Sequence, residues 1–215
     1  MSEKIIHINK ILKSIRNINQ LITKEKDINR LLSGVCKNFI EIQGYETVWI
    51  ALFDDSKKLI KIKQAGFDKD FSIIVKQLKK GEFPNCVKKI LQSKIVLTDD
   101  LLGCENCIIK DKYKNMKRMN ARLKYKKNIY GILSVSYSEI PDEKELNLFK
   151  EVANDIAFAL YNIELEKKQK EIEKRENFSK KLLEQLNKSV KKLDLIKNIT
   201  RLIKEFWESK LLELD

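Results

Sequence analysis

Residues 130–166 constrain the fold most strongly, because an apolar strand is followed by a proline and then by a long amphipathic helix. The strand is rich in aromatic and β-branched residues that suit a half-buried sheet: Tyr130, Ile132, Leu133, Val135 and Tyr137. Pro141 ends the strand, and the acidic residues after it suit a first helical turn, where the helix dipole favours negative charge. Apolar residues then recur every three or four positions: Leu146, Phe149, Val152, Ala153, Ile156, Leu160 and Ile163. The sequence therefore predicts a module that ends by projecting a helix.

The chain before this helix predicts further helices and an antiparallel sheet. Apolar residues at helical spacing run through residues 3–32, and Asp27 is a plausible N-cap for a second helix that Gly44 ends. Strands are expected at residues 47–53, 59–65, 95–98, 119–125 and 129–137, and short helices at 71–78 and 86–92. The pattern predicts an α+β fold with an antiparallel β-sheet flanked by helices and with long N- and C-terminal helices.

The C-terminal part predicts a helical extension. The segment after Ile163 is nearly all charge, which is typical of a solvated connector. An approximate heptad pattern then resumes at Leu182, Leu186, Leu193, Ile196, Ile203 and Trp207. Such a seam needs a partner. The partner is either the N-terminal helix of the same chain or, as we prefer, a second copy in a parallel coiled coil. We therefore expect an N-terminal helix at 1–25, a domain at 26–165, an extension at 166–215, and a homodimer through the terminal helices.

The net charge of +13 raises the question of a nucleic-acid partner. Basic residues are concentrated in residues 110–127, where Asp111 is the only acid. They suit a solvated surface or a rim that attracts an anionic ligand or partner. Nucleic acid is not favoured, because few aromatic residues accompany the charge and there is no recognition motif. No apolar run is long enough to span a membrane, and the N-terminus lacks signal-peptide features, so we expect a cytoplasmic protein.

Three segments resemble GAF domains, the small-molecule-binding relatives of the PAS fold, and especially those of bacterial and archaeal sensor proteins, including sensor histidine kinases. The segments are INQLITKEKDINRLLSGVC, GYETVWIALFDD, and YGILSVS followed by EVANDIAFALYNIELE. The resemblance covers about residues 18–166. It implies a GAF/PAS-like sheet with a ligand pocket, for which Trp49, Arg122 and Tyr130 are candidates. As aromatic residues in strands, Trp49 and Tyr130 also suit an ordinary core.

The cysteines suggest a metal or redox site. Cys104 and Cys107 form a C-x-x-C motif, whose thiolates can converge on one metal or on each other. Cys86 follows a proline, and it could supply a third ligand for zinc or an iron–sulfur cluster. Covalent haem and ordinary thiols are the alternatives. Cys36 falls on an apolar helical stripe and is expected in the core.

These features favour a sensory module of a signal-transduction protein. It would bind a small ligand or a cysteine-ligated cofactor, transmit its state through the terminal helices and act on a downstream signalling protein. No kinase, cyclase or phosphodiesterase motif is present in this sequence, so we do not expect an enzyme. The alternatives are a GAF-type free methionine sulfoxide reductase, with Cys86 and the C-x-x-C thiols as nucleophile and resolving group, and a non-catalytic dimerisation scaffold.

Overall fold

The structure is a computed structural model that describes residues 3–92, 95–98, 116–137, 141–188 and 192–211. Its elements in chain order are α1 (Glu3–Lys24), α2 (Ile28–Asn38), the π-helical turn η1 (Phe39–Gln43), β1 (Thr47–Phe53), β2 (Leu59–Ala65), α3 (Phe71–Lys79), α4 (Asn85–Gln92), β3 (Ile95–Thr98), β4 (Lys117–Tyr125), β5 (Asn128–Tyr137), α5 (Glu143–Lys188) and α6 (Lys192–Leu211). The chain divides into two compact units, Met1–Ile163 and Glu164–Asp215.

The first unit is built on a five-stranded sheet with the strand order β2-β1-β5-β4-β3. Every neighbouring pair is antiparallel. β5 is the central strand, and it pairs with β1 on one side and with β4 on the other. The α+β fold with an antiparallel sheet flanked by helices, expected from the sequence, is confirmed.

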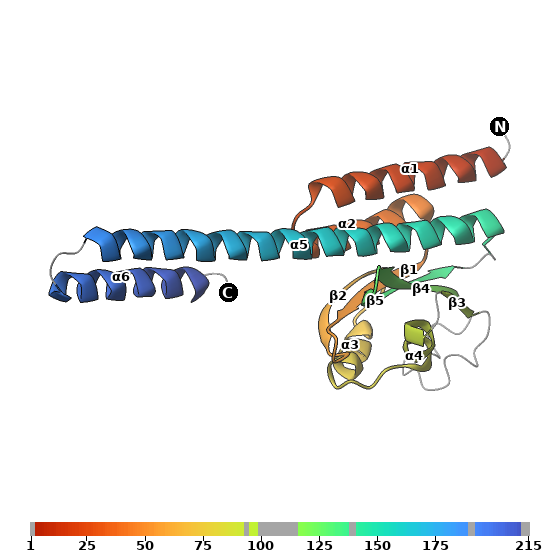
Figure 1. Cartoon of the computed structure of the whole chain (residues 1–215). Helices are drawn as coiled ribbons and strands as arrows, with labels where there is room; N and C mark the ends of the chain where they lie inside the picture. The colour runs from red at the N-terminus through yellow and green to blue at the C-terminus, as the bar shows by residue number, and fades with distance from the viewer. Residues whose placement is uncertain (1–2, 93–94, 99–115, 138–140, 189–191, 212–215) are drawn as a thin grey trace. The chain divides into compact units, whose positions relative to one another are not determined.

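Helices cover both faces of this sheet (Figure 1). Residues of α1, α2 and the first half of α5 pack on one face in a large apolar core that includes Ile18, Leu32 and Ile156. Residues of α3 and α4 pack on the other face in a smaller apolar cluster that includes Phe71 and Ile90. Strand side chains alternate between the two faces, so β1 and β5 contribute residues to both cores.

Local sequence signals set the start and end of the second helix. The Asp27 carboxylate accepts a hydrogen bond from the Arg30 backbone N–H at 2.8 Å, which makes it the predicted N-cap of α2. The helix continues into η1, and Gly44 ends that turn in the left-handed conformation at φ 78°. Tyr45 and β1 follow directly, so this turn delivers the chain to the centre of the sheet.

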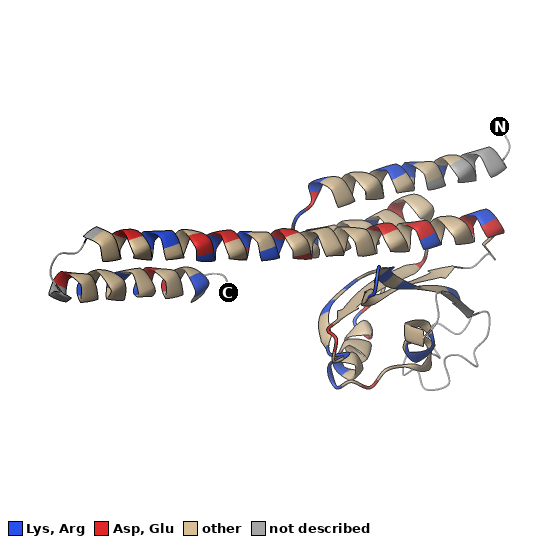
Figure 2. Cartoon of the chain, in the orientation of Figure 1, with Lys and Arg blue, Asp and Glu red and all other residues tan. Residues whose placement is uncertain are grey.

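The second unit contains the end of α5 together with α6. The rings of Phe178 and Phe206 lie 4.7 Å apart between centroids, and Leu202 is buried. α6 therefore packs against α5 of its own chain, a partner that the sequence prediction did not consider. Figure 2 shows basic and acidic residues interleaved along this part of α5.

Within the described residues, no helix is both long enough and apolar enough for a membrane crossing.

Candidate ligand-binding site

A row of buried polar residues crosses the middle of the sheet. It consists of Thr47 on β1, Ser134 and Ser136 on β5, and Arg118 and Asn120 on β4, and none of these is more than 6% exposed. We call these five residues the polar strip. Their chain neighbours, such as Val48, Met119 and Val135, lie in the core on the α1–α2–α5 side. Because strand side chains alternate, the polar strip faces the α3–α4 side.

Strand pairing brings the polar strip together in two rows. In the first row, Ser136 pairs with Thr47 on one side and with Arg118 on the other. The hydroxyl oxygens of Thr47 and Ser136 are 2.5 Å apart and share a hydrogen bond. In the second row, Ser134 pairs with Trp49 on one side and with Asn120 on the other. Residues directly opposite each other in adjacent strands lie close enough to interact, so the strip is one continuous surface.

Polar groups in this position are costly unless they are hydrogen-bonded, because burial removes them from water. Among the described residues, the buried polar side chains outside the strip are Ser14 and Asn38, and they hydrogen-bond to each other between α1 and α2. That pair is explained by helix packing alone. The strip instead combines hydroxyl, amide and guanidinium groups on one sheet face, which is the chemistry of a ligand-binding surface.

An apolar cluster adjoins the polar strip on the same face. Trp49 lies in the second row and packs edge-on against Phe71 of α3, with ring centroids 6.0 Å apart. Ile132 and the α4 residues Val87 and Ile90 belong to the same cluster. The site therefore has an apolar side and a polar side, as small-molecule sites commonly do.

Of the predicted pocket residues, the structure brings Trp49 and Arg122 to this face. Arg122 lies one row beyond Asn120, opposite Ile132. Its Nη1 donates a hydrogen bond to the Leu91 carbonyl at 3.0 Å and so ties β4 to α4. Its Nε is buried and has no hydrogen-bond partner among the described residues. Arg122 thus holds the helix over the sheet and leaves one donor for further contact.

Tyr130 is not brought to this face. The β4–β5 pairing shifts register between Leu123 and Lys124, so that Leu123 lies opposite Gly131, Lys124 lies opposite Ile129, and the register skips Tyr130. This irregularity turns the Tyr130 ring toward the α1–α2–α5 core, where it packs half-buried. Simple alternation from Ile132 would have placed it on the α3–α4 side, beside Phe53.

The cysteine predictions fall partly outside the described residues. Cys104 and Cys107 belong to residues 99–115, which the structure does not describe. Cys86 lies at the start of α4, is 4% exposed and packs in the apolar cluster with Trp49. Cys36 is buried in the other core, as expected. In the described part of the chain, no group of three histidine, cysteine or acidic residues could hold a metal ion.

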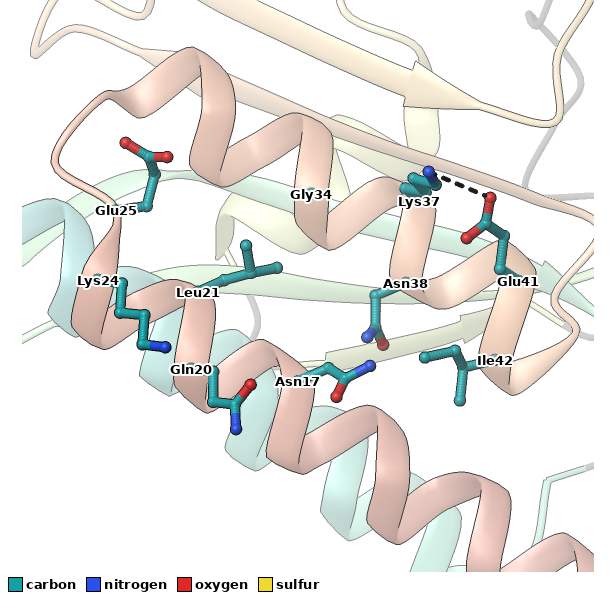
Figure 3. Close-up of a pocket in the computed structure, with 10 residues that line it drawn as sticks. All are labelled: Asn17, Gln20, Leu21, Lys24, Glu25, Gly34, Lys37, Asn38, Glu41 and Ile42. Atoms are coloured by element: carbon teal, nitrogen blue, oxygen red, sulfur yellow. Dashed lines mark ion pairs between the residues drawn. The ribbon is translucent and has the colours of Figure 1, made fainter.

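Two clefts lie away from the polar strip. One, of about 470 Å³, lies between α1 and α2, where Lys37 and Glu41 form an ion pair at 3.6 Å (Figure 3). Gln20, Lys24, Lys37 and Glu41 on its walls are exposed, so a ligand there would stay largely solvated. The other, of about 380 Å³, lies where the β1–β2 and β4–β5 turns meet α4, and its apolar residues are Phe53, Phe83, Leu91 and Ile129.

The sequence reasoning missed the polar strip, although a signal was present. Polar residues stand at every second position of β4 and at alternate positions near the end of β5, between apolar residues that are themselves buried. A strand with one apolar face and one polar face normally turns the polar face to water. Here both faces are covered, because α3 and α4 lie on the polar side.

No family model matches the chain, and no curated protein matches it in sequence. Its structure is similar to the GAF domain of a phosphoenolpyruvate-protein phosphotransferase from Coxiella burnetii, with TM-score 0.57 and 14% identity over 73% of this chain and 96% of that one. The corresponding GAF domain from Acinetobacter gives TM-score 0.53 and 15% identity over 77% and 98%. Free methionine-R-sulfoxide reductase from Neisseria meningitidis, solved with its substrate, gives 0.54 and 13% over 73% and 93%. The chain therefore has the GAF fold.

Proposed function

We propose that this chain is a sensory module of a signalling protein, which binds a small molecule on the polar strip and passes the bound state to its terminal helices. The observation that carries this proposal is the polar strip itself. Five buried polar side chains lie in register across β1, β5 and β4, beside Trp49, in a GAF fold. Ligand binding changes the output only if the ligand has different affinities for two arrangements of the helices.

A short route leads from the strip to the helix that leaves the domain. Thr47 belongs to the strip, and Tyr45 lies two residues before it. The Tyr45 hydroxyl donates a hydrogen bond to the Glu145 carboxylate in the first turn of α5, at 3.2 Å. α5 then continues into the second unit. A displacement of the first residues of β1 would therefore act directly on the start of α5.

A ligand screen on the purified full chain tests this function. A binding compound should raise the melting temperature and give saturable binding by calorimetry. Ser134→Ala removes one hydroxyl of the strip and should weaken binding about fivefold or more, since a hydrogen bond contributes about 0.5–1.5 kcal/mol and an unmatched ligand group costs further. Ser33→Ala, at an exposed site on α2, is the matched control and should bind normally. Equal affinity in both variants would place the ligand elsewhere.

The metal or redox role of Cys86, Cys104 and Cys107 stays a prediction. Zinc, an iron–sulfur cluster or haem would each be detected by metal analysis and visible absorption of anaerobically purified protein. Cys104→Ser and Cys107→Ser should each lower the metal content if the thiolates are ligands. The hypothesis is contradicted if the purified protein contains no metal and if Cys104→Ser and Cys107→Ser bind the ligand as the wild type does.

Reduction of free methionine sulfoxide is the enzymatic alternative, and it rests on the fold similarity to the Neisseria reductase. An assay with free methionine-R-sulfoxide and a dithiol reductant tests it directly. Turnover that is lost in Cys104→Ser or Cys107→Ser would favour the enzyme over the sensor. Binding without turnover would favour the sensor.

We also propose that the second unit joins two copies of the chain. α6 turns Leu202 and Phe206 toward α5, yet Ile203 and Trp207 remain 44% and 58% exposed. Other large apolar side chains are exposed on the same unit: Ile172, Leu183, Leu186, Ile196 and Leu211. A pair of helices cannot bury a second stripe, whereas the same stripe on a symmetry-related copy can cover it. Basic and acidic residues are interleaved on this unit, so each copy presents both signs of charge (Figure 2).

Light scattering after size exclusion tests this assembly. The wild-type chain should have the mass of a dimer. Ile203→Lys should shift it toward monomer, because it places a charge in the proposed interface. Ser209→Lys, at an exposed position on another side of α6, should remain dimeric. A wild-type monomer at micromolar concentration would contradict the proposal, and the stripe would then belong to a different partner.

A further inference from the structure

Every residue of the polar strip can donate a hydrogen bond. The guanidinium of Arg118 only donates, and the Asn120 amide donates through its nitrogen and accepts through its oxygen. Each hydroxyl of Thr47, Ser134 and Ser136 has one hydrogen to donate. Because Thr47 and Ser136 share one hydrogen bond, that pair uses one hydrogen internally and keeps the other. A ligand with several acceptor atoms is complementary to such a surface.

The strip also carries a permanent positive charge in a buried position. Arg118 is 6% exposed, and its guanidinium is the positively charged group of the strip. No acidic residue lies on the three paired strands β1, β5 and β4. Arg118 and Asn120 both take part in other polar interactions of the protein, so an incoming ligand has to extend those interactions or exchange with them.

Arg118 is also placed where a planar oxyanion could bind. In register it lies directly across from Ser136, whose hydroxyl is bonded to Thr47 one strand further on. The guanidinium fork matches the spacing of carboxylate or phosphate oxygens, and the adjacent hydroxyl pair can donate to the same group. Arg122, four residues beyond Arg118 along β4 on the same face, has a buried Nε that has no hydrogen-bond partner among the described residues.

We propose that the ligand of the polar strip is a small oxyanion, meaning a molecule with a carboxylate or phosphate group, and that Arg118 and the Thr47–Ser136 hydroxyl pair hold that group. This inference rests on the proposed ligand-binding function and names the chemical class that it takes. Ser134 and Asn120 then contact the next polar group of the ligand, and Trp49 contacts its apolar part.

Calorimetry on the full chain at constant ionic strength tests the class with defined probes. The anions are acetate, succinate and inorganic phosphate, and the neutral counterparts are acetamide and succinamide. At least one anion should bind saturably, and its neutral counterpart should bind at least tenfold more weakly, since hydrogen bonds to charged groups are the stronger ones. Comparing the affinities for succinate and phosphate distinguishes a carboxylate ligand from a phosphate ligand.

Variants connect that binding to the strip. Arg118→Gln should reduce anion affinity at least tenfold, and Arg118→Lys should recover part of it as a point charge without the fork. Lys124→Gln removes an exposed charge from the same strand and should bind like the wild type. Because Arg118 is buried, Thr47→Val serves as a second, nearly isosteric variant, and it should weaken anion binding severalfold while the protein stays folded.

Two results would overturn the proposal. One is that none of the anions binds saturably, and the other is that an anion binds equally well to Arg118→Gln, Thr47→Val and the wild type. The proposed ligand-binding function and the proposed oxyanion class of the ligand are contradicted by different results. If a neutral compound binds and loses affinity in Ser134→Ala while the anions do not bind, the function stands and the oxyanion class falls.

Discussion

The hydroxyl of Tyr45 donates a hydrogen bond to the carboxylate of Glu145 at 3.2 Å, and this bond joins the segment before β1 to the first turn of α5. Tyr45 is buried and packs against Phe39, with ring centroids 5.6 Å apart. Burial first, and then the neighbouring Glu145 carboxylate, raise the pKa of the Tyr45 phenol. The phenol therefore remains protonated and remains a donor across the physiological range.

Tyr45→Phe removes this donor and keeps the packed ring. We expect the free energy of unfolding to fall by about 0.5–1.5 kcal/mol, the usual net contribution of one hydrogen bond. Urea unfolding followed by circular dichroism measures the change. Tyr161→Phe, which alters a hydroxyl on a less buried face of α5, should change stability by less than about 0.5 kcal/mol. If Tyr45→Phe lowered the free energy of unfolding no more than Tyr161→Phe does, the Tyr45–Glu145 hydrogen bond would not contribute to stability.

Cys36 should be chemically inert in the folded protein. It is 1% exposed in the core, and burial raises the pKa of its thiol to about 12. Thiolates rather than thiols react with alkylating agents. At pH 8, iodoacetamide should therefore leave Cys36 unmodified in the native protein and modify it fully in urea, as peptide mass spectrometry would show. Rapid native modification would mean that the α2 core opens readily.

Asp155 should lower stability at neutral pH. Burial first, and then the carboxylate of Glu151 one helical turn earlier, raise the pKa of Asp155 above its ordinary value of 3.8. A carboxyl group with a raised native pKa holds its proton more tightly when folded. Its favourable contribution is therefore complete below the unfolded pKa and is lost as the pH rises through the native pKa.

Asp155→Asn removes this titration with little change in helix propensity. The variant should melt at a higher temperature than the wild type at pH 7, and the difference should disappear near pH 3, where the wild-type carboxyl is protonated. Asp55→Asn, in an exposed turn, is the control and should show no comparable dependence. A lower melting temperature for Asp155→Asn at pH 7 would reverse the assigned sign.

The sequence predicted the elements of this fold because their apolar periodicity is regular. The strand and helix positions, the Asp27 cap and the Gly44 end all follow from local signals. The polar strip did not, because Arg118 lies in a run of basic residues and resembles a surface charge when only composition is considered. The packing of α6 on α5 could not be predicted either, since a heptad pattern shows that a partner is needed and does not say which one.

Tyr130 shows the same limit at a single residue. Its face depends on a register shift, and a register shift is set by tertiary contacts of the neighbouring strand. Gly131 stands at this shift, and its backbone lies against β1, where it pairs with Leu52. A Cβ at Gly131 would lie 1.9 Å from the Ala51 carbonyl oxygen and 2.9 Å from the Leu52 Cα. Both are backbone atoms of an inner strand, so they cannot move without breaking sheet pairing.

Gly131→Ala should therefore lower the free energy of unfolding by more than about 4 kcal/mol, a size reserved for a few severe mechanisms, or prevent folding. Gly81→Ala is the matched control, because its φ of +79° is also unusual but no described heavy atom lies within 4 Å of the added carbon. It should cost only about 1–2 kcal/mol, the strain of a left-handed alanine. Urea unfolding of both variants measures the contrast. A Gly131→Ala protein as stable as Gly81→Ala would mean that β5 does not approach β1 this closely.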